Sequence, residues 1–171
     1  MTLRGTAALL GLLLALLAWV WRVELPPPAP ILTAPAVLLG EPLERVGRVE
    51  LIAETGTITA TKVSSEWLDQ RGSAWPTSAV DDLLQTLSTL RPLRTVPPEP
   101  GETDRYGIGQ RRLRALRFDG AVVLDLQLGK TNPTQTALYA QATGGPDILL
   151  IGAVLEWELA KLQNRDPGRD P

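Results

Sequence analysis

The sequence predicts an α+β domain on a mostly antiparallel sheet with two packed helices, preceded by a single N-terminal transmembrane helix and a proline-rich linker. Three observations support this class: an apolar run at the N-terminus, a dense group of prolines after it, and short alternating strands interrupted twice by leucine-striped segments. The 171 residues then divide into an anchor at 1–24, a linker at 25–43, an extracytoplasmic α+β domain at 44–164 and a polar tail at 165–171.

The predicted anchor rests on the run from Gly5 to Trp21, which contains no charged side chain and is followed at once by Arg22. A helix over this run approaches the roughly 30 Å hydrocarbon core of a bilayer. Arg4 before the run favours a cytoplasmic N-terminus, which places a single-pass protein in the bacterial inner membrane with its C-terminal domain in the periplasm. The residues expected to contact lipid are Leu9, Leu10, Leu12, Leu13, Leu14, Leu16, Leu17, Trp19 and Trp21.

A cleaved secretory signal peptide is the alternative for the same run. No small-x-small cleavage site follows it, and Trp19 and Trp21 lie where such a site would be expected. Both alternatives deliver the rest of the chain to the far side of the membrane. Six prolines between Leu25 and Pro42 come next, and this density favours an extended, semi-rigid spacer over a helix or a central strand.

The domain is predicted to open with a β-hairpin. Residues 48–53 alternate apolar and polar side chains, residues 57–63 are rich in β-branched residues, and Glu54-Thr55-Gly56 supplies the turn. Further strands are expected near 112–118, 122–128, 136–142 and 148–151, with turns at Asp119-Gly120, Gly129–Pro133 and Gly144–Asp147.

Two segments have helical periodicity. The first follows Pro76 and ends near Pro92, with one apolar stripe formed by Val80, Leu83, Leu84, Leu87 and Leu90. We expect Thr77 or Ser78 to cap it, and Asp81 and Asp82 to lie in its first turn, where negative charge complements the helix dipole. The second covers residues 153–163, with Leu155, Leu159 and Leu162 on one side.

The composition excludes several classes of chemistry. Seventeen basic and nineteen acidic residues give a net charge of −2, which lacks the basic excess that nucleic-acid binding requires. The chain has no histidine and no cysteine, so Ser-His-Asp and Cys-His catalysis, His-ligated zinc and thiolate metal sites are all excluded. We therefore predict no cofactor, no metal site and no enzymatic activity.

One local basic excess stands out and is the possible partner surface: Arg105, Arg111, Arg112, Arg114 and Arg117. These arginines could face anionic lipid headgroups, an acidic partner or solvent, with a solvated strand face as the default and a docking edge second. Catalysis by carboxylates alone would need two acidic groups close together, and the sequence gives no reason for Glu50 and Asp125 to meet. Trp67, Trp75 and Trp157 are expected in the core or at its rim.

Two short glycine motifs resemble fragments of phosphate-binding loops. Gly107-Ile108-Gly109 lacks the third glycine and the following lysine. Gly129-Lys130-Thr131 has no glycine five positions before Gly129, and it joins two predicted strands instead of opening a helix. We interpret the second motif as a hairpin turn.

Several short motifs occur in a familiar order. They are RVELIAETGTITATKV at 48–63, AWP at 74–76, SAVDDLLQTLSTLRPLR at 78–94, Tyr106-Gly107-Ile108, LDLQLG at 124–129, and a strand containing Tyr139. Over roughly Arg45 to Leu162 this order resembles a bacterial family of membrane-anchored domains of unknown function, numbered 4340. The family's helix usually opens with alanine-aspartate, whereas here Val80 intervenes, and its tyrosine-glycine-leucine ends in Ile108 here.

The resemblance implies an extracytoplasmic companion of membrane machinery, of the kind found beside ABC-transporter components related to gliding proteins. It implies no catalytic residues. The predicted function is a non-enzymatic, membrane-anchored accessory or scaffold subunit whose domain binds another protein of a membrane complex. The alternative is a periplasmic binding module for a lipid, glycan or peptide, with Tyr139 and Arg114 among the polar groups of its pocket.

Overall fold

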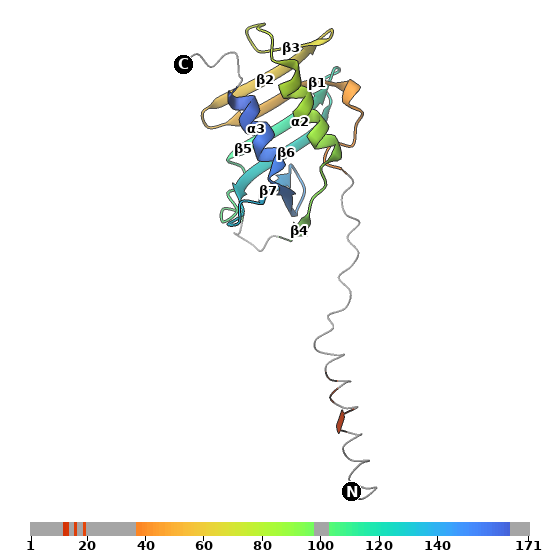
Figure 1. Ribbon diagram of the computed structural model, residues 1–171, viewed down its shortest axis with the longest axis vertical. Helices are drawn as coiled ribbons and strands as arrows, with labels where there is room; N and C mark the ends of the chain where they lie inside the picture. The colour runs from red at the N-terminus through yellow and green to blue at the C-terminus, as the bar shows by residue number, and fades with distance from the viewer. Residues whose placement is uncertain (1–11, 14–15, 17–18, 20–36, 98–102, 165–171) are drawn as a thin grey trace, which may run out of the picture. The chain divides into compact units, whose positions relative to one another are not determined.

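The computed structural model describes residues 12–13, 16, 19, 37–97 and 103–164. Residues 37–97 and 103–164 form one eight-stranded sheet and two α-helices (Figure 1). In chain order the elements are η1 (Leu43–Arg45), β1 (Val46–Ala53), β2 (Gly56–Val63), β3 (Glu66–Leu68), α2 (Thr77–Thr89), β4 (Arg94–Val96), β5 (Arg111–Arg117), β6 (Val122–Thr131), β7 (Ala137–Ala142), β8 (Ile148–Gly152) and α3 (Val154–Asn164). The predicted α+β domain with its mostly antiparallel sheet is therefore confirmed.

The strand order in the sheet is β3-β2-β1-β5-β6-β7-β8-β4. Every pair of neighbours is antiparallel, and hairpins join most of them, as the turn residues predicted. The two exceptions are β1 beside β5 and β8 beside β4, which pair strands that are distant in sequence. Central strands of the sheet thus come from both halves of the domain.

Both helices lie on the same face of the sheet and next to each other (Figure 1). The alternation along the strands decides which side chains meet them: Val49 and Leu51 on β1 are buried, while Arg48 and Glu50 are on the other face. The helices contribute the residues predicted from their periodicity, which are Val80, Leu83, Leu84 and Leu87 on α2 and Leu155, Leu159 and Leu162 on α3. One face of the sheet is consequently layered by helices, and the other face, called the open face below, carries polar side chains on its central strands.

The prediction of an N-terminal transmembrane helix is wrong. Within the described residues, no helix combines the length and the apolarity needed to cross a bilayer. Of the predicted anchor, Leu12, Leu13, Leu16 and Trp19 are described, and they are helical and exposed, while Leu9, Leu10, Leu14, Leu17 and Trp21 lie outside the described residues. The helical residues described there are too few to make up the about 20 consecutive apolar residues that a spanning helix needs.

The packed domain begins before the predicted boundary at Glu44. The backbone N–H groups of Leu38 and Leu39 donate to the carbonyl oxygens of Leu90 and Leu87, both at 3.0 Å. Leu39 is 1% exposed and belongs to the core. Leu38 and Leu39 therefore bind the backbone at the C-terminal end of α2. The proline-rich segment before residue 37 lies outside the described residues.

Three local predictions need correction. No side chain caps α2, whose N-cap residue is Pro76, and Asp81 and Asp82 lie beyond its first turn. The strand β4 was not predicted, because three residues between two prolines are too few to show a period of two. Gly129-Lys130-Thr131 is the end of β6 and not a turn, with a register irregularity between Leu128 and Thr131.

Candidate functional site

The open face of the sheet carries a row of paired charges across its central strands. Glu50 on β1 lies directly opposite Arg114 on β5, which lies directly opposite Asp125 on β6. Arg114 Nη1 donates to Glu50 Oε2 at 3.0 Å, and Arg114 Nε lies 3.8 Å from Asp125 Oδ2. Glu50 and Asp125, which the sequence gave no reason to place together, are thus joined through one guanidinium.

Arg112 completes this ion-pair row, which we define as Glu50, Arg112, Arg114 and Asp125. Its Nε donates to Asp125 Oδ1 at 2.6 Å and its Nη2 to Asp125 Oδ2 at 2.5 Å, a bidentate pairing that is the strongest form of Arg–carboxylate contact. The pairing raises the pKa of Arg112. It also lowers the pKa of Asp125. The hydrogen bond from the Thr143 hydroxyl lowers the pKa of Asp125 further, whereas burial of the carboxyl acts in the opposite direction.

The remaining arginines of the predicted partner surface point to different places. Arg111 crosses to the helical layer, where its Nη1 and Nη2 donate to the Glu156 carboxylate on α3 at 2.7 and 2.8 Å. Arg117 pairs with Asp119 in the β5–β6 turn at 3.0 Å. Arg105 lies in the loop before β5 and also has an interaction partner. The local basic excess of the sequence is therefore divided between two faces and a turn, and four of its members are neutralised by carboxylates.

Three of the motifs that carried the family resemblance come together at one end of β6. A Cβ built on Gly129 would lie 2.4 Å from the Tyr106 carbonyl oxygen, and that oxygen accepts a hydrogen bond from Lys130 N at 2.9 Å. The rings of Tyr106 and Tyr139 are 4.6 Å apart and tilted by 52°. The glycine after Leu128 thus allows the 103–109 loop to lie on the sheet, so these motifs form a structural cluster and not a phosphate-binding loop.

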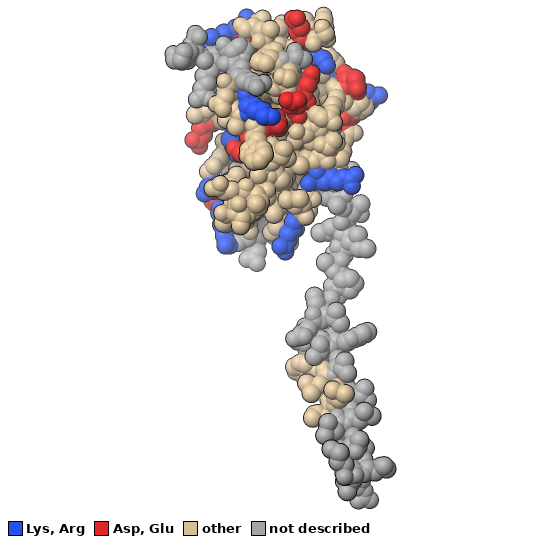
Figure 2. Space-filling model, viewed as in Figure 1, with Lys and Arg blue, Asp and Glu red and all other residues tan. Residues whose placement is uncertain are grey.

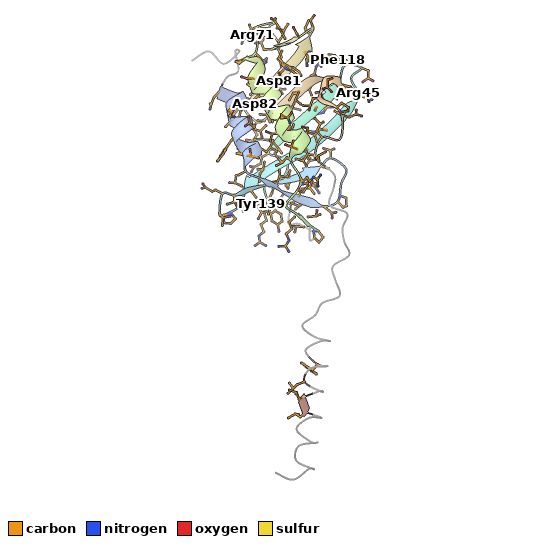
Figure 3. The ribbon with its side chains drawn as sticks, turned by 45° about the vertical axis from the view of Figure 1, so that its right-hand side comes forward. Arg45, Arg71, Asp81, Asp82, Phe118 and Tyr139 are labelled. Atoms are coloured by element: carbon orange, nitrogen blue, oxygen red, sulfur yellow. The ribbon has the colours of Figure 1, made fainter. Side chains whose placement is uncertain are left out.

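Of the two adjacent acidic residues on α2, Asp81 and Asp82, Asp81 has a structural role. Asp81 Oδ1 accepts a hydrogen bond from Trp67 Nε1 at 2.9 Å. Figure 3 shows Asp81 and Asp82 on α2 at the opposite end of the domain from Tyr139, so these groups do not share a site. Sequence reasoning missed the Trp67–Asp81 contact, since the two residues are fourteen positions apart in different elements.

A hollow with a volume of about 720 Å³ lies at the end of the β1–β2 hairpin, beside the C-terminal end of α3. Its apolar lining comes from Leu51, Ala53 and Ile58, and polar side chains come from Gln110, Arg111 and Gln163. Tyr139 and Arg114, expected in a pocket, do not line it. Its size falls in the range of small-molecule sites, and its arginine is already held by Glu156.

The described residues contain no group of three or more acidic, histidine or cysteine side chains that could hold a metal ion.

The model of the family described as "Domain of unknown function (DUF4340)" matches residues 74–166, just over half of the 171 residues. The chain belongs to the DUF4340 family. No curated protein and no solved structure matches it.

The DUF4340 match contains α2, β4 to β8 and α3, and it contains the cluster of Tyr106, Gly129 and Tyr139. The resemblance read from the sequence began earlier, at Arg45, and included β1 to β3. The family model matches only from residue 74 onwards, so these three strands lie outside the match. Glu50 is consequently the one member of the ion-pair row that lies outside the match.

Proposed function

We propose that this DUF4340 protein is a non-enzymatic accessory subunit whose folded domain binds another protein of a membrane complex. The observation that carries the proposal is Trp157 on α3, which is 70% exposed in a domain that buries Trp67 and Trp75 almost completely. A large exposed aromatic side chain costs solvation free energy in the isolated domain, and such residues are enriched where proteins bind each other.

The chemistry of the described side chains supports the same proposal. Glu50, Arg112, Arg114 and Asp125 on the open face form ion pairs with one another, and the chain has no histidine or cysteine. The resemblance to companions of ABC-transporter components leads us to place the partner in such machinery, with the domain on the extracytoplasmic side of a bacterial inner membrane.

The proposal is tested by chemical cross-linking in cells that produce the full chain, followed by purification in detergent and mass spectrometry. The expected result is a reproducible cross-link to one membrane-complex protein, absent when an unrelated protein of the same abundance is purified in the same way. Recovery of the chain without any cross-linked protein would argue against an accessory subunit.

A second candidate function is binding of a small ligand in the hollow beside the β1–β2 hairpin, and its volume of about 720 Å³ is the observation that favours it. Ala53 lines the hollow, so Ala53→Trp would fill part of it. Native mass spectrometry of the full chain purified from its own cells should show a bound small molecule that Ala53→Trp removes. A chain of unliganded mass from several preparations would eliminate this candidate.

A further inference from the structure

The hollow beside the β1–β2 hairpin has an apolar floor that the strand register builds. Leu51 lies directly opposite Ile58 across the hairpin, and Ala53 lies two residues further along β1 on the same face. We call these three residues the floor. Gln163 on α3 lines the same hollow, and Figure 1 shows the tip of the hairpin beside the C-terminal end of that helix. A ligand there would contact apolar side chains on the sheet and polar groups at the rim.

The basic group of the hollow is already engaged. Among the described lining residues, Arg111 is the one basic side chain. Its Nη1 and Nη2 donate to the Glu156 carboxylate at 2.7 and 2.8 Å, and Nη2 also donates to the Gly129 carbonyl oxygen at 3.4 Å. Because a bidentate pair of this kind satisfies the guanidinium and the carboxylate together, an anionic ligand would have to compete with Glu156 for Arg111.

Glu54 brings an uncompensated negative charge to the hollow. It lies in the hairpin turn, lines the hollow, and forms no ion pair or hydrogen bond with residues 37–97 and 103–164. The helix α3 ends at Asn164, one residue after Gln163, so the negative end of its dipole lies beside the same hollow. Figure 2 shows acidic and basic side chains interspersed around the hairpin end. The charge of the hollow is therefore set by the groups that line it, and it is negative.

We infer that this hollow binds a small organic monocation of the alkylammonium type, whose charged head meets Glu54 and whose apolar part lies on the floor. This inference rests on the second candidate function proposed above and adds to it the chemical class of the ligand. The side-chain carbonyl oxygens of Gln110 and Gln163, which also line the hollow, can accept hydrogen bonds from the ammonium head.

The lining disfavours other classes of ligand. A fatty acid or a phospholipid headgroup would place a second negative charge beside Glu54, while the guanidinium of Arg111 is held by Glu156. A metal ion would need several ligating side chains, and the described residues contain no group of three or more that could hold one. The volume of about 720 Å³ suits an organic molecule.

The test compares three probes that share a pentyl chain and differ in their head group: pentylammonium, pentanol and pentanoate, all at pH 7. Binding to the ¹⁵N-labelled full chain, purified in detergent, is followed through the amide resonances of Gly56, Gln110 and Gln163, which line the hollow. We expect pentylammonium to bind about 3-fold more tightly than pentanol, because exposed ion pairs change an affinity by only a few-fold. Pentanoate should bind about 10-fold more weakly than pentylammonium, since its charge reverses the sign of the same interaction.

Three variants locate the effect. Glu54→Gln removes the charge and keeps the shape, so it should weaken pentylammonium about 3-fold and abolish its preference over pentanol. Glu66→Gln is the matched control: Glu66 is an exposed glutamate on β3 that does not line the hollow and has no ion-pair partner among the described residues. Ala53→Trp should remove the binding of all three probes. The indole N–H resonance of the buried Trp67, at the other end of β2, reports whether each variant is folded.

The outcomes separate the ligand class from the binding site itself. Pentanoate binding as tightly as pentylammonium, or equal weakening by Glu54→Gln and Glu66→Gln, would overturn the cationic class and leave the hollow as a binding site. So would a neutral or anionic molecule that native mass spectrometry finds on the chain from its own cells and that Ala53→Trp removes. A bound amine in that preparation would confirm the class. No shift with any probe would overturn the inference, and a chain of unliganded mass would eliminate the second candidate function with it.

Discussion

The indole N–H of Trp67 on β3 donates to Asp81 Oδ1 on α2 at 2.9 Å. Trp67 is fully buried, and its ring also has the Lys62 ammonium 5.4 Å from its centre. A buried indole N–H needs an acceptor, since leaving it unsatisfied costs free energy. Asp81 therefore fixes how α2 lies on the edge of the sheet formed by β2 and β3.

Replacing Asp81 with alanine is expected to lower the free energy of unfolding by about 1–3 kcal/mol, because the buried indole N–H of Trp67 loses its acceptor. Asp81→Asn keeps an acceptor oxygen, so it should lower the free energy of unfolding clearly less than Asp81→Ala does. Urea denaturation of the full-length variants measures both values.

Asp82 provides the control for this prediction. It is the next residue on α2, is exposed, and forms no side-chain hydrogen bond with the described residues. Asp82→Ala should change the free energy of unfolding by less than about 0.5 kcal/mol. Equal losses for the two alanine variants would show that helix dipole effects, and not the indole contact, determine the role of this acidic pair.

Elements held by local sequence patterns could be predicted well. The β1–β2 hairpin follows from β-branched residues on either side of Glu54-Thr55-Gly56, and the buried stripe of α2 follows from its leucine spacing. The strand β4 could not, because it exists only through pairing with β8, more than fifty residues later. Periodicity reports which side of an element is buried and contains no information about its partner.

The ion-pair row was beyond sequence reasoning for a physical reason. Glu50 and Asp125 meet only because β1 pairs with β5 and β5 with β6 in one particular register. A shift of one residue would move Arg114 to the helical face. Trp157 was expected in the core or at its rim, but its position on α3 faces away from the sheet, opposite to Leu155 and Leu159.

The ion pair between Arg112 and Asp125 predicts a specific pH dependence. The folded state lowers the pKa of Asp125, first through the Arg112 hydrogen bonds, so its carboxylate stabilises the fold fully above the unfolded pKa of about 3.9. This contribution is lost as the pH falls through the lower, folded-state pKa. The difference in unfolding free energy between the wild type and Asp125→Asn, roughly 1–2 kcal/mol at pH 7, should be constant down to about pH 5 and shrink below about pH 4.

Thermal or urea unfolding from pH 7 to pH 2.5 measures this difference. Thr143→Val removes a weaker hydrogen bond to the same carboxylate and should show a smaller effect in the same pH range. A difference that persists unchanged at pH 2.5 would mean that Asp125 acts through packing and not through its charge.

Gly129 is predicted to tolerate no side chain. A Cβ there would approach the Tyr106 carbonyl oxygen to 2.4 Å, so Gly129→Ala must displace backbone of the 103–109 loop and separate the rings of Tyr106 and Tyr139. We expect a loss of about 1–3 kcal/mol in the free energy of unfolding. Gly40→Ala, which has no atom within 4 Å of the new Cβ, is the control and should be nearly neutral. Comparable losses at the two glycines would contradict the close approach.

Trp157 is predicted to contribute little to folding. Its side chain is 70% exposed, so Trp157→Ala should change the free energy of unfolding by less than about 1 kcal/mol. Trp75 is 3% exposed and donates from Nε1 to the Thr59 carbonyl oxygen at 3.3 Å. Trp75→Ala should therefore lower the free energy of unfolding by about 3–5 kcal/mol. Differential scanning calorimetry of the two full-length variants makes the comparison. If Trp157→Ala proved as destabilising as Trp75→Ala, its indole would be part of the core, and weaker partner binding by that variant would report misfolding instead of a lost contact.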